Sequence, residues 1–384
     1  MNKTTRYVKL VVALLVTQAG LLAASARAED KLLNEVVGFN GAILHVDIRV
    51  PGMVIGAVRN GETAVFGFGE TAPGSGRTPD GNTIMRIGSI TKAFTGHVMA
   101  TLVAQGTVKL TDRLQDRIGW GLTLPEKNGQ PIRLIHLVTH TSGLPREVER
   151  TPSPDDDPFR TLTPEAYLKA LQGNPLLFAP GSGGLYSNFA FDLLAVALGN
   201  AAGKTYDRLL KDNVLDPLGL KDTTTALRDG DSTRLMIGHN FDGKTMPTAR
   251  ANPVMAGASS LYSTPNDILR WLAWHLDRFS PQGAEVRVLD HAAYVPRDGL
   301  SPVAGFDEAG QMDAMALGWV IMAPRGNRPL VLQKSGGLQG MFAYAAFAPS
   351  RGVGVFIAIN QFSVGAFNAM GMVANGLIEQ LAPR

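Results

Sequence analysis

Apolar and polar positions near both ends of the chain follow the pattern of β-strands. Residues 52–70 contain two apolar runs separated by Asn60-Gly61, and Asn-Gly between apolar runs is the strongest short-range signal of a β-hairpin. A second strand pair is predicted at 342–348 and 353–359, with a turn at 349–352. The two ends of the chain therefore each supply an antiparallel strand pair.

Between these strand pairs the apolar spacing is mostly helical. Thr163 and Thr264 each precede a proline and an apolar run, which is the pattern of a helix N-cap. Helices are predicted at 90–104 (an amphipathic one), 164–171, 189–198, 206–215, 265–276 and 364–381. Segregated strands and helices indicate an α+β fold, with an antiparallel sheet built from the N- and C-terminal segments, flanked by helices, and an inserted, mainly helical lobe.

The N-terminus has the order of a secretory signal peptide. Lys3, Arg6 and Lys9 precede an apolar run, and Ala26-Arg27-Ala28 follows it, so cleavage is expected after residue 28. A retained membrane anchor is the alternative, disfavoured because the run is short for a membrane span. We expect residues 29–384 to form one domain, with a sheet lobe of about 29–88 plus 255–384 and a helical lobe of about 89–254.

Charge and cysteine content narrow the classes of function. Residues 1–28 hold four of the 36 Lys and Arg residues and none of the 33 acidic residues, so the remaining chain has a formal net charge of −1. A nucleic-acid partner therefore has no compositional support. The chain has no cysteine, which excludes disulfides, a cysteine nucleophile and thiolate metal sites.

The most informative local motif is Ser89-Ile90-Thr91-Lys92. Residues i and i+3 are neighbours on a helix, so the hydroxyl of Ser89 and the amine of Lys92 share a face. A lysine kept neutral by burial or by nearby positive charge can take the serine proton. Ser89 also lies where the two lobes meet, which is where sites are usually found.

Two further clusters complete the predicted site. Tyr186-Ser187-Asn188 precedes a predicted helix, and Lys334-Ser335-Gly336 precedes Gly337 and the C-terminal strands. For acyl transfer, Ser89 would attack a carbonyl, while Lys92 and a Tyr186 phenol with a pKa lowered by two flanking lysines would move the proton. Asn188 would bind the substrate amide and hold Lys92. The backbone N–H groups of Ser89 and of Gly337, expected on an edge strand, would bind the oxyanion, and Lys334 a substrate carboxylate.

Ser-x-x-Lys, Tyr-x-Asn and Lys-Ser-Gly in this order are typical of penicillin-recognising serine enzymes. The chain resembles the serine β-lactamase and penicillin-binding-protein superfamily on its class C side, and more narrowly the AmpH-type D-alanyl-D-alanine carboxypeptidase/endopeptidases. The resemblance covers nearly all of residues 29–384 and includes the stretches 137–145, 186–194, 216–224, 263–267, 316–324 and 333–337. Ser335 stands where threonine is commoner, and Asn360 falls where class C enzymes have an asparagine.

The resemblance implies a periplasmic serine D,D-peptidase that acts on peptidoglycan muropeptides, binds β-lactams and needs no cofactor. A class C β-lactamase and a class C-like esterase or D-amino-acid amidase remain alternatives, as does a weakly catalytic penicillin sensor. A loose inner-membrane association stays open, and the sequence does not determine the oligomeric state.

Two other motifs are interpreted as structural. His136 and His140 have the i, i+4 spacing of helical zinc ligands, but no third ligand is evident, so a capping or core role is expected and no metal. The stretch 199–205 is one residue short of a phosphate-binding loop and follows a helix, so it is interpreted as a helix end and turn.

Overall fold

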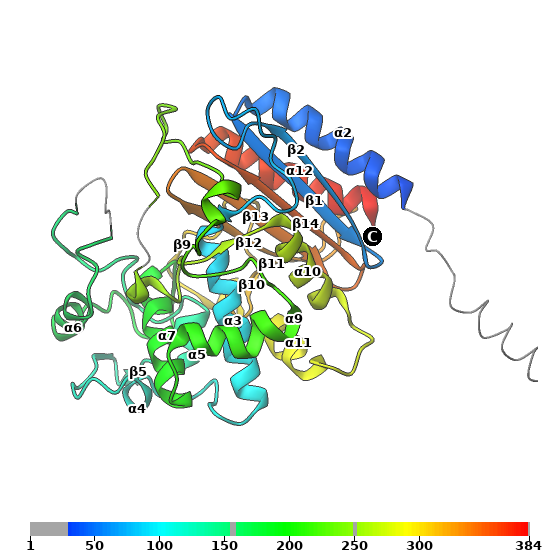
Figure 1. Cartoon of the computed structure of the whole chain (residues 1–384). Helices are drawn as coiled ribbons and strands as arrows, with labels where there is room; N and C mark the ends of the chain where they lie inside the picture. Colours follow the sequence, from blue (N-terminus) through cyan, green and yellow to red (C-terminus); the bar gives the residue numbers. More distant parts are fainter. Residues whose placement is uncertain (1–29, 154–158, 249–251, 383–384) are drawn as a thin grey trace, which may run out of the picture. The chain divides into compact units, whose positions relative to one another are not determined.

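The computed structural model describes residues 30–153, 159–248 and 252–382, so the predicted signal peptide lies outside the described residues. The described residues form an α+β fold around one large antiparallel sheet (Figure 1). Its strand order is β2-β1-β14-β13-β12-β11-β10-β8. The strands are β1 (Gly52–Arg59), β2 (Glu62–Gly69), β8 (Val295–Pro296), β10 (Ala314–Met315), β11 (Val320–Met322), β12 (Val331–Leu338), β13 (Met341–Ala348) and β14 (Val353–Ile359).

The sheet joins the two ends of the chain, as the sequence predicted. Strands β1 and β2 form a hairpin whose turn residues Asn60 and Gly61 both have positive φ, 54° and 80°. Strand β1 then pairs with β14 along its length, from Met53 opposite Ile359 to Arg59 opposite Val353. The N-terminal hairpin therefore depends on the C-terminal strands for its second neighbour.

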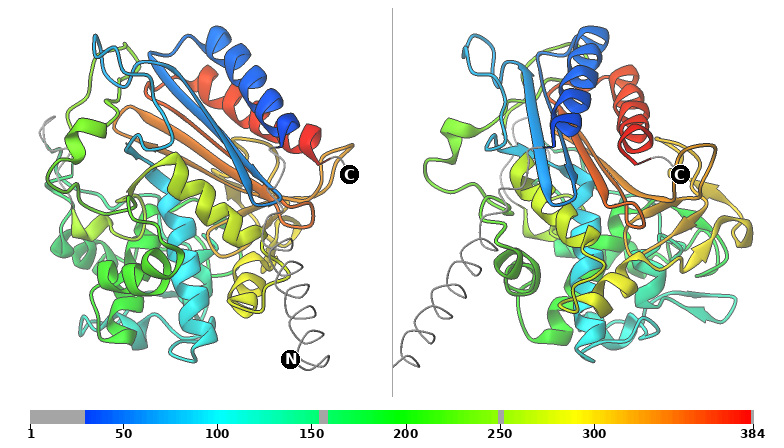
Figure 2. Two further views of the ribbon diagram at one scale, coloured as in Figure 1. Left: turned by 45° about the vertical axis from the view of Figure 1, so that its right-hand side comes forward. Right: turned by 90° about the vertical axis from the view of Figure 1, so that its right-hand side faces the viewer.

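Alternate residues of the central strands face two separate cores, because successive strand side chains point to opposite faces. Met53 and Ile55 of β1 pack under α2 (Lys31–Ile48) and α12 (Val364–Leu381), which lie on one face of the sheet (Figure 2). Val54 and Val58 face the other core, which includes α3 (Thr91–Ala104) and α10 (Pro265–Leu276).

The remaining elements are mostly short. The helices are α4 (Gln115–Ile118), α5 (Leu134–Val138), α6 (Pro164–Gln172), α7 (Asn188–Ala202), α8 (Tyr206–Leu210), α9 (Asp216–Leu218) and α11 (Ala284–His291), with η1 (Gly88–Ile90), η2 (Lys211–Leu215), η3 (Asp231–Arg234), η4 (Pro253–Met255) and η5 (Arg297–Gly299). Three strand pairs lie outside the main sheet: β3 (Met85–Arg86) with β7 (Tyr262–Ser263), β4 (Glu126–Lys127) with β5 (Gln130–Pro131), and β6 (Gly184–Leu185) with β9 (Val303–Ala304). No helix in these described ranges is long and apolar enough to cross a membrane.

Two helix predictions are corrected by the structure. Helix α2 was not predicted, because apolar side chains occur on both its buried face (Leu33, Val37) and its exposed face (Phe39, Ile43), which blurs the amphipathic pattern. The helix predicted at 90–104 is α3, preceded by the short helix η1. It is buried on nearly all sides and not amphipathic, because α7 and α11 both pack against it.

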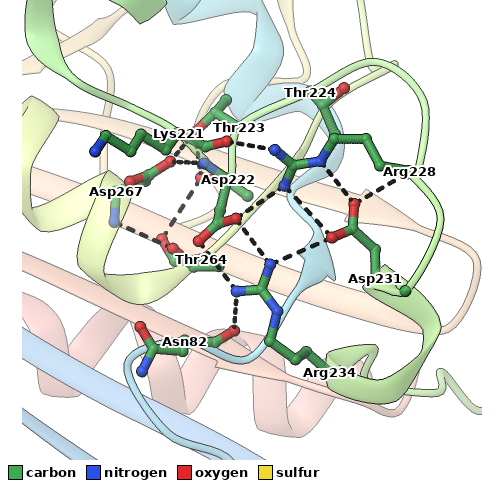
Figure 3. Close-up of polar contacts among 12 residues, drawn as sticks. Asn82, Lys221, Asp222, Thr223, Thr224, Arg228, Asp231, Arg234, Thr264 and Asp267 are labelled. Carbon is green, nitrogen blue, oxygen red and sulfur yellow. Dashed lines mark hydrogen bonds and ion pairs between the residues drawn. The ribbon is translucent and has the colours of Figure 1, made fainter.

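An ion-pair network ties the segment after α9 to the start of α10 (Figure 3). Asp222 accepts hydrogen bonds from Arg228 and Arg234, each at 2.8 Å. The backbone N–H of Asp222 and the hydroxyl of Thr223 both donate to Asp267, in the first turn of α10. Two of the family-like stretches, 216–224 and 263–267, thus meet here, beside β7 and its partner strand β3, which leads into Ser89.

Candidate active site

Ser89 lies in η1, directly before α3, where the chain passes very close to strand β12. A Cβ on Gly88, whose φ is +51°, would lie 2.7 Å from the Gly337 nitrogen. A Cβ on Gly336 would lie 3.0 Å from the Ser89 nitrogen. Glycine at 88 and 336 therefore permits the close approach that brings the backbone of Ser89 beside that of Gly337.

Lys92 is completely buried one turn further along, and its Nζ lies 3.2 Å from Ser89 Oγ. The same Nζ donates to Asn188 Oδ1 at 2.5 Å and to the Ala258 carbonyl at 2.9 Å. Burial, followed by the charge of Lys334, lowers the pKa of Lys92 well below its ordinary value. The structure thus brings Ser89, Lys92 and Asn188 together as the sequence predicted.

Tyr186 also belongs to this cluster, but its pKa moves in the direction opposite to the prediction. Its hydroxyl is hydrogen-bonded to Ser89, and Lys92 Nζ and Lys334 Nζ lie 4.9 and 4.8 Å from its ring centroid. Burial nevertheless raises the pKa of the Tyr186 phenol, because desolvation of the phenolate outweighs the hydrogen bond from Ser89 and the charge of Arg146. The phenol therefore keeps its proton at neutral pH.

Asn188 is the first residue of α7 and connects Lys92 to a carboxylate that sequence reasoning missed. While Asn188 Oδ1 accepts from Lys92, its Nδ2 donates to Glu147 Oε1 at 2.5 Å. A side-chain amide cannot exchange these two roles, so the pair of contacts fixes its orientation. No pattern in the sequence connects Glu147 with a residue 41 positions away.

Strand β12 carries Lys334, Ser335, Gly336 and Gly337. The sequence predicted an edge strand here, but β12 lies between β13 and β11 in the sheet. It pairs with β13 along its length, and with β11 only as far as Gln333. From Lys334 onward the β11 side is therefore open, and η1 approaches this stretch. Lys334 is 3 % exposed, and burial lowers its pKa to about 8.

A cavity of about 360 Å³ opens over Ser89 and Tyr186. Two charged residues that the sequence analysis did not select, Arg146 and Glu308, line it. Ser335 Oγ donates to Glu308 Oε2 at 2.5 Å. The remaining lining residues are Ser335, Gly336, Gly337, Asn368 and an apolar wall of Phe241, Phe342, Phe362, Val364 and Phe367.

Asp192, one turn into α7, is a further residue near the site that the sequence analysis did not select. It is 2 % exposed, accepts from the Tyr167 hydroxyl at 2.6 Å and from the Ala258 N–H at 3.1 Å, and its pKa is raised by burial to about 8. Ala258 also accepts from Lys92. Asp192 therefore holds the residue whose carbonyl positions the amine.

The two histidines considered as metal ligands have structural contacts. His136 Nδ1 accepts from the Arg133 N–H at the start of α5, and His140 Nδ1 accepts from the Ser187 N–H while its ring stacks on Tyr186. Asn360 is also structural: it is completely buried, and its Oδ1 accepts from the Gly52 N–H at 2.7 Å.

Within the described ranges, His275, Asp290 and His291 are close enough to hold a metal ion. His275 Nδ1 and His291 Nε2 are 2.8 Å apart, and Asp290 Oδ2 accepts from the Trp319 indole. The other ring nitrogen of His275 is buried without a hydrogen-bond partner in this part of the structure. Histidines that bind metals almost always use that second nitrogen to contact an acceptor, so the cluster is a poor metal site.

Comparison with known proteins identifies the same family that the sequence motifs resemble. The β-lactamase family model matches residues 26–373. The chain is 34 % identical over 364 residues, 94 % of this chain and 92 % of the relative, to the D-alanyl-D-alanine-carboxypeptidase/endopeptidase AmpH of Escherichia coli K12. It is 24 % identical to a β-lactamase of Pseudomonas fluorescens over 336 residues, which is 81 % of this chain and 89 % of that one.

Solved structures agree with this result. A β-lactamase/D-alanine carboxypeptidase from Yersinia pestis, complexed with citrate, matches with a TM-score of 0.84 and 36 % identity over 92 % of this chain and 99 % of that one. A class C β-lactamase matches in fold, with a TM-score of 0.74 and 18 % identity over 92 % of this chain and 97 % of the other. The chain therefore belongs to the β-lactamase family of serine hydrolases.

Proposed function

We propose that this protein is a periplasmic serine D,D-peptidase, a D-alanyl-D-alanine carboxypeptidase and endopeptidase that cleaves peptidoglycan peptides through an acyl-enzyme on Ser89 and binds penicillins. The observation that carries the proposal is the contact between a buried Lys92 amine and the Ser89 hydroxyl. The named activity of the Escherichia coli relative supports the substrate class, and the signal-peptide pattern supports export.

Lys92 is the general base for acylation in this proposal. A neutral amine has two N–H groups and one lone pair, and the contacts with Asn188 Oδ1 and the Ala258 carbonyl use both N–H groups. The lone pair then faces Ser89 Oγ at 3.2 Å and accepts its proton as Oγ attacks the substrate carbonyl. The lowered pKa of Lys92 keeps the amine neutral for this step.

Tyr186 and two backbone amides complete the reaction. The protonated Tyr186 phenol contacts Ser89 and lies near Lys92 and Lys334, so it relays to the leaving amine the proton that Lys92 has taken from Ser89. The N–H groups of Ser89 and Gly337 stabilise the oxyanion of the tetrahedral intermediate. Water then releases the acyl group from Ser89.

The class C β-lactamase alternative differs from this proposal in how fast the acyl-enzyme is hydrolysed. The Pseudomonas fluorescens relative, named only as a β-lactamase, matches at 24 % identity, against 34 % for the Escherichia coli peptidase. Lys334 is retained, which disfavours an esterase, because a neutral ester gives that cation no carboxylate to bind.

The test uses the purified protein with a fluorescent penicillin and with a muropeptide that ends in D-Ala-D-Ala. We expect a stable adduct on Ser89 and release of D-alanine, both lost in Ser89→Ala and kept in the control Ser350→Ala, which changes an exposed serine at the distant β13–β14 turn. Rapid penicillin turnover without D-alanine release would instead identify a β-lactamase. Ester hydrolysis without either reaction would identify an esterase.

A further inference from the structure

A chain of contacts runs from the nucleophile to the Glu147 carboxylate. Lys92 Nζ lies 3.2 Å from Ser89 Oγ and donates to Asn188 Oδ1. The Asn188 Nδ2 group in turn donates to Glu147 Oε1 at 2.5 Å. The proposed mechanism gives Glu147 no role, although its carboxylate contacts the side chain that holds the base.

The backbone on both sides of Glu147 is held in place. The Arg146 carbonyl accepts the N–H groups of Asn188 and Phe189 at the start of α7. On the other side, the Val148 side chain is buried in the core that also contains residues of α3 and α7. The Glu147 side chain is exposed, but its backbone is fixed against the start of α7. The fold therefore places this carboxylate at Asn188 before any substrate binds.

The contact with Glu147 determines which way the Asn188 amide points. An ionised carboxylate only accepts hydrogen bonds, so the NH2 group of Asn188 must face Glu147, and its oxygen faces Lys92. In the reversed orientation the Asn188 oxygen would face the carboxylate, and its NH2 group would donate to the lone pair that Lys92 needs for Ser89. The observed orientation also leaves the second N–H of Asn188 for the substrate amide.

Glu147 also affects Lys92 through its charge. Burial and the charge of Lys334 lower the pKa of Lys92. Glu147 acts in the opposite direction, because a negative charge favours the ammonium form. Among the described residues, the charged and titratable groups around Lys92 are Tyr186 and Asp192 near the start of α7, Lys334 on β12, His140 after α5, and Arg146 and Glu147. Removing the charge of Glu147 therefore lowers the pKa of Lys92 further, which a change in helix stability alone would not do.

We propose that Glu147 is a positioning residue for acylation: it holds the Asn188 amide so that the lone pair of Lys92 points at the nucleophile. The inference rests on the proposed function, in which Lys92 is the general base for an acyl-enzyme on Ser89. A carboxylate near a helix N-terminus also stabilises the helix through its dipole. The experiment therefore compares the effect on the acylation rate with the effects on pH dependence and on stability.

The measurement is the rate of Ser89 labelling by a fluorescent penicillin at different pH values. In Glu147→Gln we expect the maximal rate to fall about tenfold, because a glutamine can also donate and so permits the reversed Asn188 amide. The pH at which labelling rises to half its maximum should also fall, because Lys92 loses a neighbouring negative charge and becomes neutral at lower pH. Glu147→Asp keeps the charge on a shorter side chain, so it should lower the maximal rate and leave the half-maximal pH unchanged.

The matched control is Glu149→Gln, which removes the same charge from an exposed carboxylate further along the same segment and should change neither value. If the maximal rate of Glu147→Gln falls but the half-maximal pH does not, Glu147 only stabilises the start of α7, which the melting temperature would show, and the proposal is overturned. A maximal rate equal to that of the unmodified protein overturns it as well.

Failure of the peptidase proposal is distinguishable from failure of this inference. A protein that is labelled on Ser89 but releases no D-alanine from a muropeptide is not the proposed peptidase, and its labelling rates still decide the role of Glu147. If penicillin does not label the protein, an NMR titration of the lysine side chains decides instead, with the Lys92 signal identified from Lys92→Arg. The pKa of Lys92 should then be lower in Glu147→Gln than in Glu149→Gln, and equal values would overturn the inference.

Discussion

The Lys92 amine and the Asn188 side-chain oxygen are 2.5 Å apart, although the residues are separated by 96 positions in the chain. This contact joins the first motif to the second and determines where the lone pair of a neutral Lys92 can point. The second donor contact, to Ala258, completes the orientation. The proposed base is thus held in place by two other segments of the chain.

Asn188→Asp is expected to move the pH dependence of acylation upward. A carboxylate beside Lys92 favours the ammonium form, so the pKa of Lys92 rises and the neutral base appears only at higher pH. The measurement is the rate of fluorescent-penicillin labelling of Ser89 against pH, with Asn188→Ala as the control that removes the contact without adding charge. If the labelling rate of Asn188→Asp rises over the same pH range as that of the unmodified protein, Lys92 is not the base.

Acylation in the unmodified protein should fall as pH rises through about 8. The pKa of Lys334 is lowered to about 8 by burial, so above that pH the ammonium loses its proton and no longer supports charge near Tyr186. Lys334→Arg should abolish this fall in rate at high pH, because a guanidinium stays protonated. If the rate still falls in the same way in Lys334→Arg, a group other than Lys334 causes the fall.

Glu308→Ala should open the Ser335 hydroxyl and Lys334 to a substrate carboxylate. We expect KM for a peptide that ends in free D-Ala-D-Ala to fall by about threefold to tenfold, because its carboxylate no longer meets that of Glu308. Glu308→Gln, which removes the charge but keeps an acceptor for Ser335, should have a smaller effect. A higher KM in Glu308→Ala would show that the carboxylate supports binding instead of excluding it.

Asp222→Asn should destabilise the fold at neutral pH without changing the site chemistry. The hydrogen bonds and charges of Arg234 and Arg228 lower the pKa of Asp222, so its stabilising effect is present above its unfolded pKa, about 3.9, and is lost as pH falls through the lower folded value (Figure 3). Thermal unfolding at pH 7 should show a loss of about 1 kcal/mol. The difference from the unmodified protein should vanish near pH 2, and a constant difference would mean that packing, not charge, is responsible.

The fold was predictable where local patterns agree with tertiary packing. The Asn60-Gly61 turn and the Thr264 cap each specify their geometry through neighbouring residues, and both occur as predicted. Helix α2 was missed because Phe39 and Ile43 are exposed apolar residues that obscure its buried face. Burial of a helix depends on what packs against it, and the local sequence does not contain that information.

For the site, the sequence alone determined which residues the proposed mechanism uses. Ser89, Lys92, Tyr186, Asn188 and Lys334 stand in ordered motifs, and each motif has a short spacing that local backbone geometry can satisfy. Only the tertiary structure decided their protonation and their partners. Burial keeps the proton on Tyr186 and favours its loss from Lys92, while Glu147, Arg146 and Glu308 arrive from distant segments. The physical reason is that a pKa depends on desolvation and on every nearby charge, and both are set by the whole fold.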